Sequence, residues 1–101
     1  MEGYNVNLLP SAQLDILGIA EYLCMQGPES AEQHLDRVIE KVETLAVAPG
    51  NYPSAKDTQL RLRGYRVFPV NSHLMFFIIK GRSVEVRRVL YAKRKYESLF
   101  K

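Results

Sequence analysis

The side chains best suited to chemistry gather in residues 61–101, and most of them are cationic. Arginine presents a planar fork of N–H donors that matches phosphate and carboxylate groups. Tyr65, Tyr91 and Tyr96 interleave with these cations and could stack on nucleic-acid bases. We predict an interaction surface for an anionic target, in preference to a merely solvated face. Its basic members are Arg61, Arg63, Arg66, Arg87, Arg88, Lys93, Arg94 and Lys95.

Acid–base chemistry has few candidates beside these cations. Metal-free cleavage of RNA needs a base for the 2′-hydroxyl, an acid for the leaving oxygen and cations for the phosphoryl charge. Only His73 and Tyr91 fall near the basic residues, and we assign His73 to the same binding surface. The other histidine, His34, belongs to a different predicted element, with no cysteine or carboxylate at ligand spacing. The sequence therefore predicts no metal site and no cofactor.

Charge is distributed unevenly along the chain. Residues 1–60 carry three basic and nine acidic side chains, a net charge of −6, whereas residues 61–101 carry eleven basic and two acidic ones, a net charge of +9. The sum is the overall net charge of +3. A basic half of this density favours polyanions or an acidic protein partner. The alternative is that the two halves neutralise each other within the fold.

Length and composition predict a single globular domain over residues 1–101. The 101 residues are 47% hydrophobic, which is enough for an ordinary core. No apolar run approaches the length of a membrane span, and the first residues lack the pattern of a signal peptide. The lone cysteine, Cys24, cannot form an internal disulfide, and we expect it buried on the apolar face of a helix. These features lead us to expect a cytoplasmic protein.

A predicted β-hairpin positions the cationic residues. Residues 74–79 form a bulky apolar run that is typical of a strand covered on both faces. Gly81 can adopt the positive φ of a tight turn, and residues 83–91 form a second run rich in β-branched residues. Arg87 and Arg88 are adjacent in this run, so we expect their side chains on opposite faces of the sheet.

The N-terminal half predicts a short strand followed by two helices. Residues 4–9 alternate partly and end at Pro10, after which Ser11 is a suitable helix N-cap. Gly27 can end the first helix in a left-handed conformation, and Ser30 with Gln33 resembles a capping box for a second helix that starts within 28–31 and runs to about residue 47. Apolar residues recur at spacings of three and four in both helices, as in Ala12, Ile16, Leu17, Ala20, Leu23 and Cys24, and in Ala31, Leu35, Val38, Val42 and Leu45. The short connection predicts an antiparallel helical hairpin.

The remaining segments complete an α+β fold. Residues 49–60 contain two prolines and predict a plain loop, whereas residues 66–70 predict an edge strand because Pro69 cannot donate a hydrogen bond. Asn71 and Ser72 predict a turn into the central hairpin, and the tail predicts a short turn or helix with Leu99 and Phe100 docking back. The order is β-α-α-β-β-β, with the helical hairpin on one face of a small, mostly antiparallel twisted sheet. We expect the other face to be covered by no helix and to display the arginines.

The chain resembles the RelE/ParE superfamily of type II toxins, and in particular its ParE-like branch. The resemblance rests on the C-terminal stretch LRGYRVFPVNSHLMFFIIKGRSVEVRRVLYAKRKYESLF and on the N-terminal SAQLDILGIAEYL, and it spans nearly the whole sequence. It implies a small toxin that a cognate antitoxin neutralises by wrapping an extended, partly helical tail over the basic surface. It also implies a hetero-oligomer of the two proteins, encoded by neighbouring reading frames.

The superfamily divides by target. RelE-like members cleave mRNA in the ribosomal A site, whereas ParE-like members inhibit DNA gyrase. Ribonuclease members often have an aromatic residue or histidine followed by arginine at the start of the third strand, where this chain has His73-Leu74. Ala92 occupies the position of a histidine found in some of them, and Phe100 stands where others have a tyrosine. The resemblance therefore favours a gyrase inhibitor that works by binding. The alternatives are a ribosome-dependent mRNA endoribonuclease using Arg66, Tyr91 and Arg94, and a non-toxic antitoxin-binding module.

Overall fold

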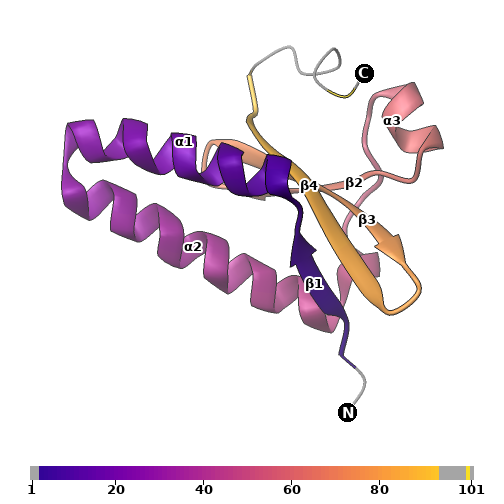
Figure 1. The fold of residues 1–101 in the computed structure, drawn as a ribbon. Coiled ribbons are helices and arrows are strands. Elements are labelled where there is room, and N and C mark those ends of the chain that lie inside the picture. The colour runs from indigo at the N-terminus through magenta and orange to yellow at the C-terminus, as the bar shows by residue number, and fades with distance from the viewer. Residues whose placement is uncertain (1–2, 94–99, 101) are drawn as a thin grey trace.

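A helical hairpin packs on a four-stranded sheet whose strand order is β1-β4-β3-β2 (Figure 1). The computed structural model describes residues 3–93 and 100. The elements are β1 (Asn5–Leu8), α1 (Pro10–Gln26), α2 (Pro28–Val47), η1 (Pro49–Asn51), α3 (Thr58–Leu62), β2 (Arg66–Val70), β3 (His73–Lys80) and β4 (Ser83–Tyr91). The predicted α+β class and the order of the main elements are confirmed. The short helices η1 and α3 replace the plain loop predicted between α2 and β2.

The β3–β4 hairpin forms the centre of the sheet, as predicted. Lys80 pairs with Ser83 across a two-residue turn, and Gly81 in this turn has φ +58°. The turn between β2 and β3 contains Asn71 with φ +57°, a conformation that asparagine tolerates better than most residues. β2 and β4 run antiparallel to β3, whereas β1 pairs in parallel with β4. The sheet is therefore mixed, with one parallel edge.

A β-bulge in β4 changes the faces of its residues. Phe76 lies opposite Arg88 whereas Phe77 lies opposite Val86, so Arg87 is an extra residue in the ladder. Strict alternation is interrupted at this point, and the prediction that Arg87 and Arg88 point to opposite faces is wrong. Val86 and Val89 consequently both join the core beneath the helices, although they are three residues apart.

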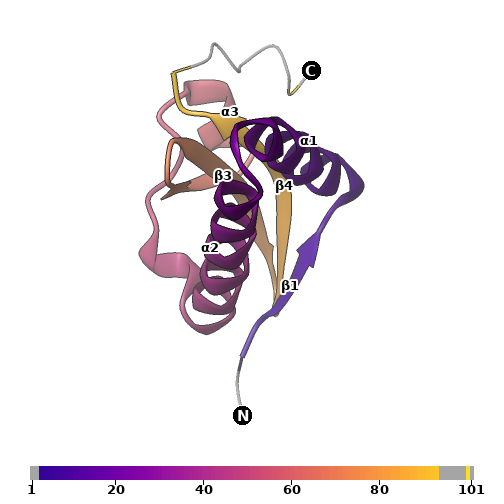
Figure 2. The same ribbon diagram turned by 90° about the vertical axis from the view of Figure 1, so that its left-hand side faces the viewer.

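Side chains cover both faces of the sheet. Figure 2 shows α1 and α2 in front of one face, and the larger core lies between them and the sheet. A second cluster lies on the opposite face, where Leu60 of α3, Ala55 and Tyr65 pack on Phe76 and Leu90. The expectation that no helix covers this outer face is therefore wrong. The physical reason is that alternate residues of β3 are large on both sides, so the outer face also has apolar area to bury.

Proline, and not a side-chain cap, marks the start of both long helices. Pro10 and Pro28 are the first helical residues, where the missing N–H has no intrahelical partner to lose. Ser11 and Ser30 therefore lie inside the helices, and neither N-terminus has a side-chain capping bond. Gly27 links the helices with φ 161°, an extended conformation and not the left-handed one expected.

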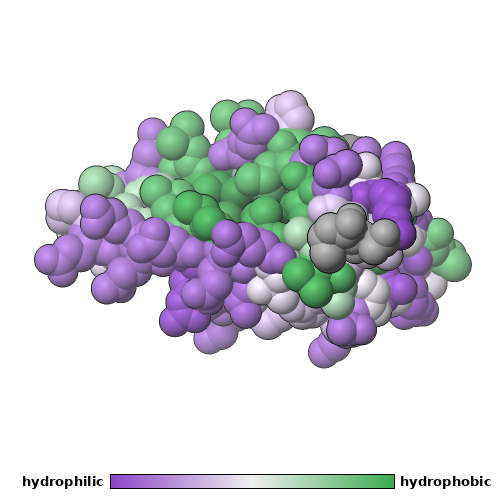
Figure 3. Space-filling view, turned by 90° about the horizontal axis from the view of Figure 1, so that it is seen from below, coloured by the Kyte–Doolittle hydropathy of each residue, from purple (hydrophilic) through white to green (hydrophobic). Residues whose placement is uncertain are grey.

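The helical hairpin exposes much of its apolar surface. Cys24 is exposed, against the prediction that it is buried, and Leu17 and Leu35 are also exposed although both belong to the predicted apolar faces. Figure 3 shows the hydrophobic residues gathered in a band over the hairpin, bordered by hydrophilic ones. Within the described part of the chain, no helix is both long and apolar enough to cross a bilayer.

The free flank of β2 is largely closed to further pairing. The N–H of Val67 points away from β3 and donates to the carbonyl of Pro53 at 3.1 Å. Pro69, the next residue facing the same way, has no N–H. The predicted edge position of this strand is thus confirmed.

Candidate functional site

Arg88 is bound to α1 by a bidentate ion pair. Its Nε donates to Oδ2 of Asp15 at 2.7 Å and its Nη2 donates to Oδ1 at 2.8 Å. The same Oδ2 accepts the backbone N–H of Val89 at 2.9 Å. The hydrogen bonds that Arg88 donates to Asp15 raise the pKa of Arg88 above its ordinary value. Arg88 therefore joins the first helix to the last strand. Sequence patterns did not predict this partner, which is 73 residues away.

Arg66 also has a structural role. Its Nη1 donates to the carbonyl of Tyr52 at 2.6 Å and to that of Gly50 at 3.5 Å. Arg66 lies opposite Phe77 in the ladder, and directly opposed residues share a face of the sheet. Because Phe77 belongs to the core beneath the helices, the side chain of Arg66 leaves its strand on the helix side. Its guanidinium stabilises the segment that connects α2 to α3.

Three of the predicted cations lie around the outer face. Arg87 forms hydrogen bonds to Oε1 of Glu85 at 2.7 and 3.2 Å, and its guanidinium lies 5.9 Å from the ring centroid of Tyr65. The hydrogen bond from Arg87 lowers the pKa of Glu85. Arg63 donates to the carbonyl of Phe100 at 2.9 Å, and Arg61 donates to that of Lys56 at 3.2 Å. The basic surface on this side is thus built on an aromatic cluster.

The predicted basic set does not form one surface. Arg61, Arg63 and Arg87 belong to the outer side, Arg66 and His73 to the helix side, and Arg88 is paired with Asp15. Lys93 is exposed just after β4, whereas Arg94 and Lys95 lie outside the described residues. The binding role of the set remains a prediction, and the exposed Arg61, Arg63 and Lys93 are its most accessible members.

The two histidines meet although they lie on different elements. The ring centroids of His34 and His73 are 5.7 Å apart, and those of His73 and Tyr91 are 5.8 Å apart. His34 is only 3% exposed, and its Nε2 is buried without a hydrogen-bond partner. Burial lowers the pKa of both histidines, and the neighbouring His73 lowers that of His34 further. Both imidazoles therefore take up a proton less readily than an ordinary histidine side chain.

The sequence contained a signal for the buried histidine that the prediction missed. His34 precedes Val38 by four residues and Leu45 by eleven, so it lies on the buried stripe of α2. Within the described residues, no group of three or more histidine, cysteine or acidic side chains could hold a metal ion.

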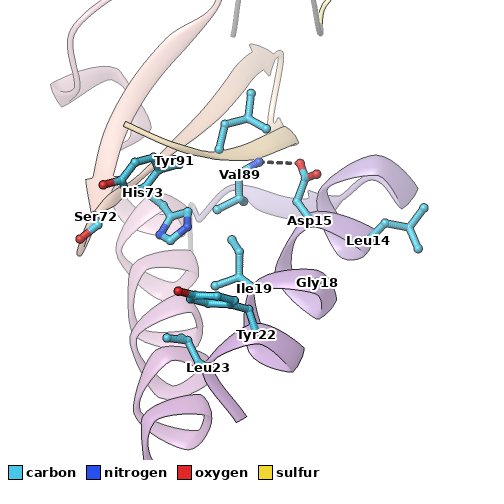
Figure 4. Close-up of a pocket in the computed structure, with 11 residues that line it drawn as sticks. Leu14, Asp15, Gly18, Ile19, Tyr22, Leu23, Ser72, His73, Val89 and Tyr91 are labelled. Atoms are coloured by element: carbon cyan, nitrogen blue, oxygen red, sulfur yellow. Dashed lines mark hydrogen bonds between the residues drawn. The ribbon is translucent and has the colours of Figure 1, made fainter. Parts of the chain in front are cut away.

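A cavity of about 650 Å³ opens between α1 and the ends of β3 and β4 (Figure 4). The helix side is mostly apolar, and Gly18 leaves open space because no heavy atom lies within 4 Å of the position of an added Cβ. On the sheet side, the cavity meets His73, Tyr91 and the backbone of the strand end. The residues that line it are Leu14, Asp15, Gly18, Ile19, Tyr22, Leu23, Ser72, His73, Val89, Leu90 and Tyr91.

A second apolar groove lies on another side of α1. It has a volume of about 600 Å³ and includes Leu17 of α1 and Leu35 of α2. Leu14 lines both hollows, so α1 presents apolar residues in two directions besides its buried face. The sequence predicted one apolar face for this helix and did not predict either hollow.

Comparison with known proteins identifies the family. The family model described as the ParE toxin of the type II toxin–antitoxin system, parDE, matches residues 6–96. No protein of curated function matches the sequence. A solved chain from the chromosomal ParDE TA system of P. aeruginosa is 18% identical, with a TM-score of 0.74 covering 92% of this chain and 100% of that chain. At this identity the likeness concerns the fold alone, whereas the family match spans nearly the whole sequence. The chain belongs to the ParE toxin family of type II toxin–antitoxin systems.

Proposed function

We propose that this protein is a toxin that inhibits DNA gyrase by binding, and that a cognate antitoxin neutralises it. Family membership supports the antitoxin partnership, because ParE toxins belong to toxin–antitoxin pairs. The gyrase target is what the resemblance to the ParE-like branch implies. The charge distribution supports a protein partner with acidic segments, since residues 61–101 carry a net charge of +9. Neither part requires a bound metal or cofactor.

One observation favours binding over RNA cleavage. One residue that cleavage would use is engaged within the fold, because Arg66 donates a hydrogen bond to the carbonyl of Tyr52. A cation that stabilises phosphoryl charge must be free to contact the substrate. The arrangement therefore supports a toxin that acts as a binder.

Two assays with the purified toxin separate the candidate functions. We expect the toxin to block DNA supercoiling by gyrase and to leave translated messages intact in a ribosome-based primer-extension assay. Fresh cuts within codons, with gyrase unaffected, would support the mRNA endoribonuclease instead. Failure of both assays, together with normal growth on induction, would leave only the non-toxic antitoxin-binding module.

Exposed cations of the predicted surface provide a residue-level test. Arg61 and Lys93 are exposed, and the described contact of Arg61 is a single surface hydrogen bond. We expect the double variant Arg61→Ala, Lys93→Ala to inhibit gyrase at least tenfold less while its unfolding temperature stays unchanged. Arg37→Ala, which removes an exposed cation from α2, is the matched control and should retain full inhibition.

A further inference from the structure

We propose that the short helix α3 carries the surface with which the toxin contacts gyrase, and that Leu62 enters an apolar pocket bordered by carboxylates on the enzyme. The α3 surface consists of Lys56, Arg61, Leu62 and Arg63. This inference rests on the proposed inhibition of gyrase and specifies which part of the toxin binds. Its basis is an apolar side chain that a hydrogen-bonded turn of helix holds in solvent among cations.

The connection that contains α3 is long and ordered. Residues 48–65 join α2 to β2, whereas most connections in compact domains have about 4–6 residues. Connections of this length are usually functional or disordered. This one is ordered by η1, by α3 and by a bridge between Ser54 and Arg66. It covers the outer face of the sheet, on the side away from the two long helices, but that role requires only its buried residues (Figure 1).

Hydrogen bonds fix α3 at both ends. At the start, Oδ1 of Asp57 accepts the N–H of Leu60 at 3.0 Å, which caps the first turn. At the other end, Gly64 has φ +89° and its N–H donates to the carbonyl of Arg61 at 3.0 Å. The N–H of Tyr65 donates to the carbonyl of Leu60 at 3.0 Å, which completes a Schellman motif. The side chains of α3 are thus presented on a preorganised backbone, which lowers the entropic cost of binding.

The two leucines at the end of α3 have opposite environments. Leu60 is 3% exposed and packs in the outer cluster, whereas Leu62 is 80% exposed. Arg61 and Arg63, which flank Leu62 in the sequence, are exposed too. Single exposed leucines are common on proteins. Leu62 differs from such a residue by its fixed backbone and its cationic neighbours, and its apolar area is open to a partner.

The chemistry of the α3 surface favours an acidic protein surface as its partner. The described contacts of Arg61 and Arg63 each use one terminal nitrogen, Nη1, which bonds a backbone carbonyl. A guanidinium has five N–H donors in a planar fork that suits carboxylates. An apolar centre with a charged rim is the usual anatomy of a protein–protein interface. The phosphate backbone of DNA could pair with the cations, but it offers no apolar pocket for Leu62.

Substitution of Leu62 tests the apolar contact. We expect Leu62→Ala to require at least tenfold more toxin for half-inhibition of supercoiling by purified gyrase. Leu62→Met, which keeps the apolar bulk, should stay within about threefold of the parent. Val47→Ala is the matched control, because Val47 at the end of α2 is also largely exposed, at 76%. The unfolding temperatures of these variants should equal that of the parent.

The outcome for Leu62 separates this inference from the proposed function. Equal inhibition by Leu62→Ala and Val47→Ala would overturn the α3 surface and leave gyrase as the target. A parent toxin without effect on gyrase would overturn both. Loss of inhibition in Leu62→Met as severe as in Leu62→Ala would also contradict an apolar pocket.

Charge reversal tests the rim of the surface. We expect the double variant Lys56→Glu, Arg61→Glu to inhibit gyrase at least tenfold less than the parent. Arg37→Glu reverses an exposed cation of α2 and should retain inhibition. Linear duplex DNA, added to the toxin without gyrase, is the probe for a nucleic-acid surface, and we expect no binding at inhibitory concentrations. Binding of this DNA that Lys56→Glu, Arg61→Glu abolishes and Leu62→Ala leaves unchanged would overturn the proposal.

Discussion

Asp15 makes three hydrogen bonds to β4 through one carboxylate, two from the guanidinium of Arg88 and one from the N–H of Val89. Both charged side chains are largely buried, with exposed fractions of 14% for Asp15 and 23% for Arg88. Pairs of this kind contribute little over an apolar replacement, but removal of one partner is costly because the other is left uncompensated. The pair therefore specifies how α1 is placed on the sheet.

Replacement of this carboxylate should destabilise the fold. We expect Asp15→Ala to lower the free energy of unfolding by about 2–3 kcal/mol, because it removes the carboxylate that accepts hydrogen bonds from a largely buried arginine and from a backbone donor. Chemical denaturation measures the change, with Glu21→Ala on the exposed side of α1 as control. A loss equal to that of the control would show that the pair contributes nothing specific.

The two histidines should make stability depend on pH. Their pKa values are lowered from the ordinary 6.5, so the unfolded chain takes up protons more readily than the folded chain as the pH falls below that value. We expect the free energy of unfolding to reach its full value above about pH 6.5 and to decrease as the pH falls below 6.5. His34→Leu should reduce this decrease, and it should not destabilise the protein at pH 7.5, because it removes a buried nitrogen that has no partner. The same pH dependence in the parent and the variant would contradict this account.

At the scale of elements, the two-residue turn between β3 and β4 depends on backbone conformation. Gly81 has φ +58°, where a Cβ is disfavoured although open space surrounds the position. We expect Gly81→Ala to cost about 1 kcal/mol from backbone strain alone. Gly18→Ala, in the interior of α1 and equally free of contacts, should instead stabilise the fold by about 0.5–1 kcal/mol. Denaturation curves of the two variants should thus shift in opposite directions.

Local patterns predicted the elements well. The hairpin, its turn, the edge strand and the helix ending at Val47 all follow from short-range rules of periodicity, glycine and proline. The second helix starts at Pro28, within the predicted range of 28–31. The first helix starts at Pro10, and Ser11 is not its N-cap, because proline is favoured in the first helical turn.

The site was harder to predict because it depends on long-range contacts. The β-bulge at Arg87 reversed the face of the sheet expected for the residues that follow it. No glycine, proline or other turn residue in this stretch indicates the bulge. The Asp15–Arg88 pair and the His34–His73 contact join residues that are 73 and 39 positions apart. Exposure of Cys24, near the end of α1, follows from how far the helical hairpin extends past the sheet, which periodicity does not report (Figure 1).

At the scale of the whole molecule, the opposite charges of the two halves govern association. Exposed carboxylates lie along α2, while Arg61, Arg63 and Lys93 lie at the other side of the sheet or beyond its end. Surface charges of this kind steer encounter more than they add affinity, and salt screens them over about 10 Å at 0.1 M.

Association with the antitoxin should therefore be sensitive to salt. We expect the association rate constant to fall about tenfold between 50 and 300 mM salt, with a smaller change in the dissociation rate. Stopped-flow mixing measures both rates. The association rate constant of the Arg61→Ala, Lys93→Ala variant should depend less steeply on salt than that of the parent. The same dependence in both proteins would show that other charges steer the association.

The closed flank of β2 has a consequence for behaviour at high concentration. Growth of a cross-β fibril requires that each new strand find a row of unpaired donors on the last one. Along this flank the N–H of Val67 already donates to the carbonyl of Pro53, and Pro69 has no N–H to donate. Copies of this protein at high concentration in a cell therefore could not add strands to one another along the free edge of β2.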